Sequence, residues 1–235
     1  MTEGYKKLAH VQSKLRLAHT HCKMTVEHEK VMPETTGKKM ATAASGMMAG
    51  MLQDFEPVRN HDMLFNSIHF YVSDPQRQVE SNHYCGHLTE DFRQCLIYDS
   101  HNTYKARLIG VEYIISARMF ESLPAEEKKY WHSHRYEVHS GLLIMPGVPE
   151  MQEEVEMKKL GDTYGKTWHF WQVDKGDPLP YGPAQLMGSF TADGQVNGQL
   201  LKLRDEKFKI STVHKHDRRV GMNFAVPHPA ADKFK

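Results

Sequence analysis

A series of short segments rich in β-branched and aromatic residues constrains the fold of this chain more than any other feature. These segments stop at turn-forming sequences such as Ser73-Asp74-Pro75 and Asp99-Ser100. Strand-forming residues bounded in this way predict short β-strands. We expect strands over residues 67–72, 93–98, 106–116, 141–145, 168–173, 185–190 and 208–213.

Three segments favour helices. In residues 40–55, Met and Ala recur at helical spacing before Pro57. The segment 122–132 begins at Ser122, a good helix-capping residue. The segment 151–160 is highly charged, which is typical of a surface helix. We expect the first helix to cover the protein's own core. The alternative is that its Met-rich surface packs on a partner helix or a lipid surface.

The order of these elements shows no regular alternation of strands and helices, which indicates an α+β fold. No linker divides the chain after residue 56. We therefore expect a single domain over residues 40–235, with a mixed or antiparallel sheet of short strands and flanking helices. Residues 1–39 are rich in His and Lys and are expected to form a polar N-terminal arm.

Composition excludes several classes of protein. The 235 residues carry 30 Lys and Arg against 29 Asp and Glu, a net charge of +1, so no global field favours nucleic acid. No apolar run is long enough for a transmembrane helix, and the N-terminus lacks a secretory signal. The seven basic residues over 202–219 are expected to form a solvated face, with contact to anionic lipid headgroups or RNA as the alternative.

The three cysteines do not form a disulfide framework, because their number is odd and their spacing irregular. This usage favours a reducing compartment, the cytoplasm. Cys95 is expected to be a packing residue. Cys85, next to several histidines, is a candidate metal ligand or nucleophile.

Histidine is the most informative residue type, since the chain has 16 and many lie between His61 and His139. His83 and His87 would share one ion on a helical or tightly bent backbone, and Gly86 favours such a turn. On an extended strand the two side chains would be about 13 Å apart, too far for a common ion.

A second group of candidates is His69, Glu112 and His132, each next to apolar or aromatic residues. An acid in the apolar strand around Glu112 needs a cation or metal as partner if it is buried. We therefore predict a metal site. Glu137 and His134 are candidates for orienting the ligands or moving protons. The predicted metal ligands are His69, His83, His87, Glu112 and His132.

Nitrogen and oxygen ligands of this kind suit Zn or Fe, with Mn less favoured. The spacing of His132, His134 and Glu137 also has a partial match to the metal-binding string of cupin barrels, which we keep as a minor alternative. No nucleophile elbow, phosphate-binding loop or dinucleotide fingerprint is found in the sequence.

Several longer strings, in order along the chain, resemble the oil body-associated proteins of plants and their fungal and bacterial relatives. The resemblance extends from about residue 47 to 220, and the strings occupy residues 82–88, 91–100, 106–114, 131–134, 140–147, 164–169 and 177–183. It implies association with seed oil bodies, that is lipid droplets, and a role in their size and stability. The family implies no settled enzymatic activity. The sequence lacks the long apolar hairpin of oleosins, so we expect any contact with a droplet to be peripheral.

Three functions follow as hypotheses. The first is a peripheral lipid-droplet protein with a His/Glu metal site. The second is a metal-dependent enzyme that acts on a small apolar or lipid-derived substrate. The third is a soluble binding domain whose histidines serve packing and hydrogen bonding without a metal.

Overall fold

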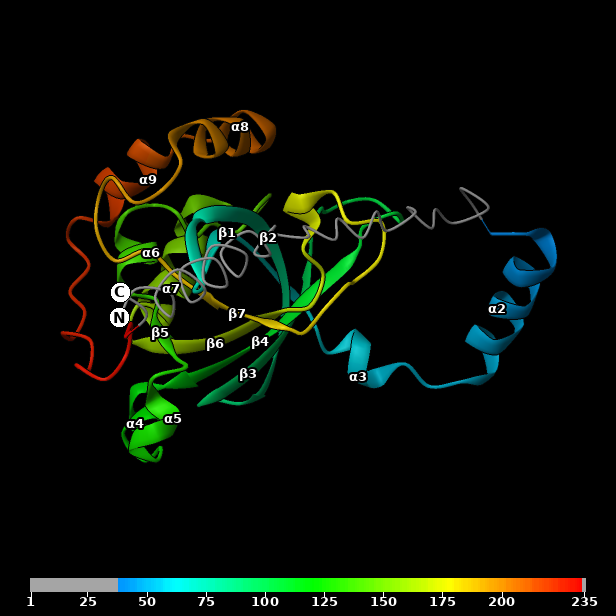
Figure 1. Cartoon of the computed structure of the whole chain (residues 1–235), viewed down its shortest axis with the longest axis horizontal. Helices are drawn as coiled ribbons and strands as arrows, with labels where there is room; N and C mark the ends of the chain where they lie inside the picture. The colour runs from blue at the N-terminus through cyan, green and yellow to red at the C-terminus, as the bar shows by residue number, and fades with distance from the viewer. Residues whose placement is uncertain (1–37, 234–235) are drawn as a thin grey trace, which may run out of the picture. The chain divides into compact units, whose positions relative to one another are not determined.

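The computed structural model describes residues 38–233, and its centre is a closed barrel of six antiparallel strands (Figure 1). The strands run in the order β4-β3-β2-β1-β7-β6, and an additional pairing of β4 with β6 closes the ring. The strands are β1 (Met63–Tyr71), β2 (Asp74–Thr89), β3 (Phe92–Tyr98), β4 (Leu108–Ser116), β6 (Thr163–His169) and β7 (Gln185–Gly188). The two-residue strand β5 (His132–Ser133) pairs with β6.

The register aligns polar residues of different strands inside the barrel. Ser67 pairs with Ser81 across β1 and β2, and Glu112 pairs with Thr167 across β4 and β6. Because side chains alternate between the two faces of a strand, residues two apart from these also point inward. The middle of the barrel interior is therefore polar.

Apolar clusters close both ends of this polar interior. At one end, Phe65, Ile114 and the Cys85–Cys95 pair pack against helical residues from the segment between β4 and β6, including Val138 and Met157. At the other end the cluster consists of Tyr71, Val79, Ile97, Ile109 and Met187. The two clusters shield the polar groups between them from solvent.

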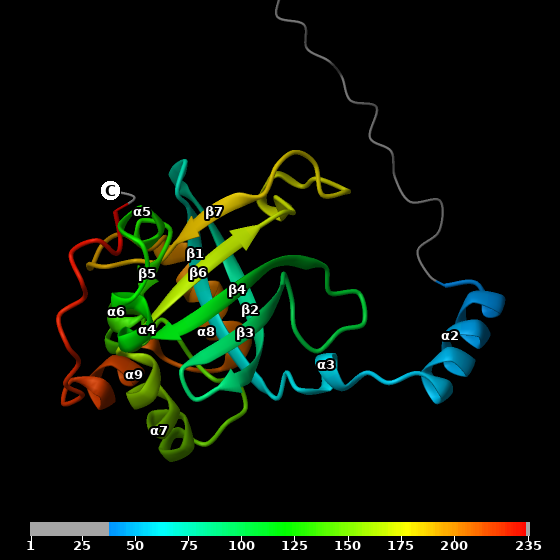
Figure 2. The same cartoon turned by 90° about the horizontal axis from the view of Figure 1, so that it is seen from below.

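Helices α4, α6, α7, α8 and α9 lie around the barrel (Figure 2). Helix α6 contacts both α7 and α9, and α4 contacts β4 and β6. The α8 residues Leu200 and Leu201 pack on Ile68 and Phe70 of β1. The helices and the 3-10 turn are α2 (Met40–Leu52), α3 (Glu56–Arg59), α4 (Ala117–Glu121), α5 (Ala125–Lys128), α6 (Arg135–His139), α7 (Glu150–Leu160), η1 (Val173–Lys175), α8 (Gly198–Phe208) and α9 (Thr212–Arg219).

The predicted α+β class, the single domain and the flanking helices are confirmed, and the sheet is antiparallel and closed. Strands predicted over 67–72, 93–98 and 106–116 correspond to β1, β3 and β4. The strand predicted over 208–213 is wrong, because this segment is the junction between α8 and α9, where the Ser211 side chain caps α9.

Two other predictions need correction. Residues 141–145 make only an isolated bridge, between Ile144 and Asn66, instead of a strand. The tight turn suggested by Gly86 is also wrong, since β2 continues through this position. A Cβ on Gly86 would lie 1.8 Å from the backbone oxygen of Asn60, so glycine is needed here for a close approach of two chain segments.

Helix α2 confirms the prediction of a helix in the 40–55 segment but corrects its expected role. None of its residues is buried, and Met47, Met51 and Leu52 are 72%, 81% and 82% exposed. It therefore does not cover the protein's own core. Within residues 38–233, no helix has the length and apolar character needed to cross a bilayer. Residues 1–37 of the predicted polar arm lie outside the described part of the chain.

The basic segment at 202–219 is a solvated face only in part. Its exposed members are Lys202, Lys207, Lys209 and Arg218, whereas Arg204, Lys215 and Arg219 are buried. Arg219 donates to the carbonyl oxygens of Val138 and Leu143, and Lys215 pairs with Glu153 at 2.5 Å. Three of the seven cations thus hold α8 and α9 on the body of the protein.

Cys95 is a buried packing residue as expected, but the expectation that the cysteines are unpaired is wrong. Cys85 on β2 and Cys95 on β3 are directly paired across the two strands, and their sulfur atoms form a disulfide. Neither is a free thiol, so Cys85 is not available as a nucleophile or a metal ligand in this state.

Candidate metal centre

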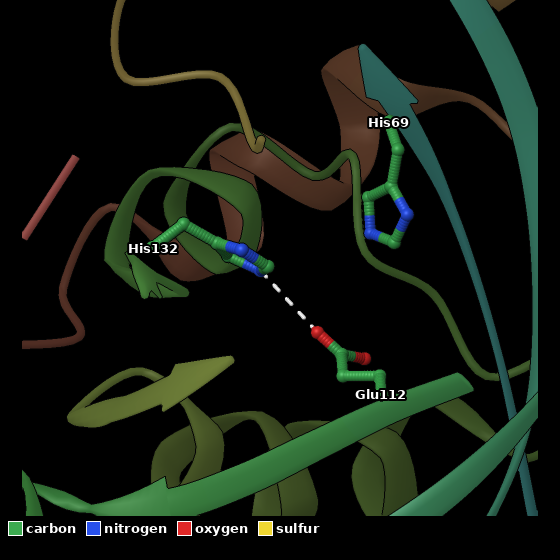
Figure 3. A group of neighbouring side chains, drawn as sticks. All are labelled: His69, Glu112 and His132. Carbon is green, nitrogen blue, oxygen red and sulfur yellow. Dashed lines mark ion pairs between the residues drawn. The ribbon is translucent and has the colours of Figure 1, made fainter. Parts of the chain in front are cut away.

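Imidazoles from separate strands meet inside the barrel around one carboxylate. His69 comes from β1, His83 from β2, Glu112 from β4, and His132 from β5, and all four side chains are buried. Figure 3 shows three of them converging, with His132 directed at the carboxylate of Glu112. Period-2 alternation places each on the inner face of its strand.

Glu112 is the centre of the cluster. Its Oε1 lies 3.3 Å from Nε2 of His132 and 3.6 Å from Nε2 of His134, and its Oε2 lies 3.6 Å from Nε2 of His83. Two ligand atoms bound to one tetrahedral ion by bonds of about 2.1 Å are about 3.4 Å apart. These separations are therefore close to those between ligands of a metal ion.

Two groups of three residues offer ligand atoms that all lie within 4.8 Å of one another. The first group is His69, Glu112 and His132, and the second is His132, His134 and Glu137. Both groups are fully buried. They are close enough to hold a metal ion.

Most ring nitrogens of the cluster have no conventional partner. Among the described residues, neither nitrogen of His83, His132 or His169 makes a well-aligned hydrogen bond, and Nδ1 of His69 also lacks one. Buried polar atoms in native proteins nearly always have a partner. A ligand that accepts lone pairs would satisfy these nitrogens.

Electrostatics divides the histidines into two kinds. Burial lowers the pKa of His69 and His83, and it lowers the pKa of His169 to about 3, so these imidazoles are neutral at physiological pH. Burial also opposes the charge on His132, but the adjacent Glu112 carboxylate, together with the charges of Glu137 and Asp232, outweighs burial and raises its pKa. Neutral imidazole is the form that binds metals.

Glu112 remains ionised although it is buried. Burial alone would raise the pKa of this carboxyl, but His132 and His134 beside it outweigh burial and hold the pKa well below its ordinary range. The hydroxyl of Thr167 donates a further hydrogen bond to Oε1 at 2.8 Å. The cluster therefore presents a carboxylate and several neutral imidazoles, the donor set that Zn and Fe bind.

Gly165 on β6 makes room for this arrangement. A Cβ at this position would lie 2.3 Å from Oε1 of Glu112, 2.7 Å from Nε2 of His132 and 2.8 Å from Nε2 of His134. Any side chain would displace three of the candidate ligand atoms. The absence of a side chain at residue 165 is thus a requirement of the cluster.

Polar neighbours orient the outer members of the cluster. Nδ1 of His134 lies 2.8 Å from the hydroxyl of Thr163, and the hydroxyl of Ser67 donates to Glu137. Metal-binding histidines commonly use one nitrogen for such a contact and the other for the metal.

The structure brings together four of the five predicted ligands and leaves one outside. His87 lies on β2, four residues from His83, where its exposed side chain contacts the backbone oxygen of Thr89 at 3.1 Å. Because β2 is extended at this point, the pair does not share a site.

Sequence reasoning missed one member of the cluster and gave another a different role. His169 on β6 is buried, and its ring centroid is 5.7 Å from that of His69. Gly165, Thr167 and His169 are spaced by two residues, and this alternation is the signal that places His169 in the interior. His134, predicted to orient the ligands, lies at ligand distance from Glu112.

The cavity at the cluster is small. Its volume is about 10 Å³, and its lining includes Ser67, His69, His83, Glu112 and Glu137. This is the space of about one water molecule. Metal ions held directly by the side chains need no larger cavity, whereas the site has no room for an organic substrate in this conformation.

Comparison with known proteins agrees with the resemblance inferred from the sequence. The family described as a protein of unknown function, DUF1264, matches residues 55–223. Oil body-associated protein 1B of Arabidopsis thaliana is 43% identical over 199 residues, which cover 85% of this chain and 81% of that protein. Oil body-associated protein 1A of Zea mays is 44% identical over 191 residues, which cover 81% of this chain and 78% of that protein.

Oil body-associated protein 2C of Arabidopsis thaliana is 38% identical over 206 residues, which cover 86% of this chain and 85% of that protein. No solved structure matches the chain. The family match spans the whole barrel and the positions of every member of the buried cluster. The chain therefore belongs to the DUF1264 family, the family of the oil body-associated proteins.

Proposed function

We propose that this protein is a peripheral lipid-droplet protein whose barrel is built around a buried site for a divalent transition metal. The ligands of this site are drawn from His69, His83, Glu112 and His132. The metal is Zn or Fe, with Mn less favoured, because imidazole is the main donor.

The observation that carries the metal site is the set of buried ring nitrogens without partners around an ionised carboxylate. Polar groups that are buried without partners reduce stability, by about 1–3 kcal/mol each. An ion coordinated by these atoms removes the cost for several groups at once. Apolar core residues would fill the same space without the cost of burying polar groups.

The small cavity favours a closed metal site over the alternative of a metal-dependent enzyme. A lipid-derived substrate needs far more space than the 10 Å³ at the cluster. A site that is closed to substrate supplies stability and shape to the barrel.

Association with lipid droplets is supported by the names of the relatives, which are oil body-associated proteins. Helix α2 is the contact that we propose. It has no charged residue between Met40 and Leu52, and its large apolar side chains are exposed. Lys38 and Lys39 precede it and suit the anionic headgroups of a phospholipid monolayer.

Metal analysis of the purified full chain tests the site. The protein is expressed in metal-supplemented medium without an affinity tag, and the variants Glu112→Gln and His132→Gln are treated identically. We expect about one equivalent or more of a transition metal in the wild type and a loss in both variants. His87→Gln, an exposed histidine on the strand that carries His83, is the matched control and keeps its metal.

The proposal fails if every transition metal is below about a tenth of an equivalent in the wild type. It also fails if Glu112→Gln retains the full metal content, because the metal would then be bound elsewhere. In that event the histidines of the barrel form a polar network without an ion.

Flotation with lipid droplets tests the surface contact. We expect the full chain to float with phospholipid-coated triglyceride droplets, and the variant with Met47, Met51 and Leu52 changed to Ser to remain in solution. Val213→Ser, an exposed apolar position on α9, is the control and continues to float. A wild-type protein that stays unbound at low salt refutes the droplet contact.

A further inference from the structure

Glu137 on α6 is a buried carboxylate that the proposed metal site does not use. Its side chain is 1% exposed, and its hydrogen-bond partner is the hydroxyl of Ser67. Over residues 38–233, no Lys or Arg lies within ion-pair distance of it. A buried carboxylate without a cation is costly and needs a proton or a metal ion nearby.

The neighbours of Glu137 are two further candidate ligands. His132, His134 and Glu137 offer ligand atoms that lie within 4.8 Å of one another. The ring centroids of the two histidines are 5.1 Å apart. The chain provides this grouping through local structure, because β5 carries His132 and the first turn of α6 follows immediately, with His134 as its N-cap and Glu137 in the helix.

We propose that the barrel holds two metal ions, the second bound by His134 and Glu137 next to the first at His69 and Glu112. His132 belongs to both groups, so the two positions would share it. This inference rests on the proposed metal function and specifies how many ions the same cluster takes. Two ions near each other suit a site whose carboxylates, Glu112 and Glu137, supply one negative charge to each position.

Orientation of the side chains supports a ligand role for His134. Its Nδ1 is occupied by the hydroxyl of Thr163 at 2.8 Å, and its Nε2 faces Oε1 of Glu112 at 3.6 Å. The second nitrogen is therefore directed into the cluster. Ser67 likewise holds the carboxylate of Glu137 from the β1 side of the barrel.

Metal stoichiometry of the full chain, loaded with Zn²⁺ or Co²⁺ and dialysed against a weak chelator, tests the proposal. We expect the wild type to bind one equivalent more than Glu137→Gln and one more than His134→Gln. Each comparison is a difference between two proteins, so ions bound by histidines outside the barrel cancel. Gln keeps the size of Glu137 and an oxygen for Ser67, and circular dichroism confirms that each variant is folded.

The outcomes separate the two proposals. No bound metal in the wild type overturns the proposed function and this inference together. Metal content that falls in Glu112→Gln and is unchanged in Glu137→Gln and His134→Gln overturns only the second ion.

A second measurement uses Mn²⁺ as the probe in electron paramagnetic resonance. Two neighbouring ions broaden each other's signal, and we expect Glu137→Gln to restore the sharp six-line pattern of an isolated ion. An isolated-ion spectrum in the fully loaded wild type refutes the paired arrangement.

Discussion

Replacing Gly165 with alanine tests the metal centre most directly, because it adds a single methyl group and removes no ligand. That methyl group would lie 2.3 Å from Oε1 of Glu112, where ordinary contacts begin at 3.4 Å. The carboxylate must therefore move by about 1 Å, and the rings of His132 and His134 must move by somewhat less. The backbone of Gly165 does not have a positive φ, so strain in the main chain does not contribute.

Two effects follow from this displacement. Overpacking of a filled interior costs about 1–3 kcal/mol, and we expect this loss in the unfolding free energy of the metal-free protein. Metal ligands tolerate only a few tenths of an ångström, so we expect the affinity for Zn²⁺ to fall by about 100-fold, the upper end of the effect of mutations around metal ligands.

Competition with a chromophoric chelator measures the affinity, and urea unfolding measures the stability. Gly198→Ala is the control, since a Cβ there meets no atom within 4 Å and lies at the start of α8. Wild-type Zn²⁺ affinity in Gly165→Ala, together with normal stability, would refute the geometry of the cluster as described.

Three further predictions concern the disulfide, proton release and the ion pairs at the far end of the barrel. Cys95→Ala removes the disulfide to Cys85, which closes a loop with a sequence separation of 10, and we expect a loss of about 2–3 kcal/mol in urea unfolding. The metal must displace the proton of the His132 imidazole, whose pKa is raised. Metal affinity should therefore rise about tenfold per pH unit below this pKa. An affinity that is constant between about pH 5 and 7 contradicts this prediction. Burial disfavours the charge on Asp174, but Arg77 outweighs burial and lowers its pKa. Because the pKa of Asp174 is lower in the folded protein than the value of about 3.9 in the unfolded chain, its charge stabilises the fold above that pH. Asp174→Asn should therefore reduce the free energy of unfolding by about 1–3 kcal/mol at neutral pH, and by less as the pH falls below about 4.

The strands of the barrel were predictable where their residues are strongly strand-forming. Residues 106–116 contain Leu108, Ile109, Val111, Ile114 and Ile115, and β4 forms there. β2 was not predicted, since Asp74–Thr89 is mostly polar and contains Pro75 and Gly86. Polar residues occupy both faces of β2, since Ser81 and His83 face the polar interior and Glu80 pairs with Lys207 of α8 on the outside. The apolar alternation that normally identifies a strand is therefore absent.

The candidate site was predictable in its residue types and only partly in its membership. Glu112 is identified by the contrast between an acid and its apolar neighbours, and this contrast depends only on local sequence. His87 and His169 were misjudged because their roles depend on whether β2 bends and on how β6 pairs with β4. Closure of the barrel, which decides both, is set by contacts far apart in the sequence.

Closure of the barrel also bears on the proposal of a metal centre in its interior. The strands enclose five histidines and two glutamates in a space that apolar side chains would fill at lower cost, as two apolar clusters do at either end. The proposed ion would offset this cost, so metal binding and folding would be coupled. With free metal at 1,000 times the dissociation constant, this coupling contributes about 4 kcal/mol, a large part of the stability of a domain of this size. Chelation would then loosen the barrel from its centre, where all six strands contribute to the wall.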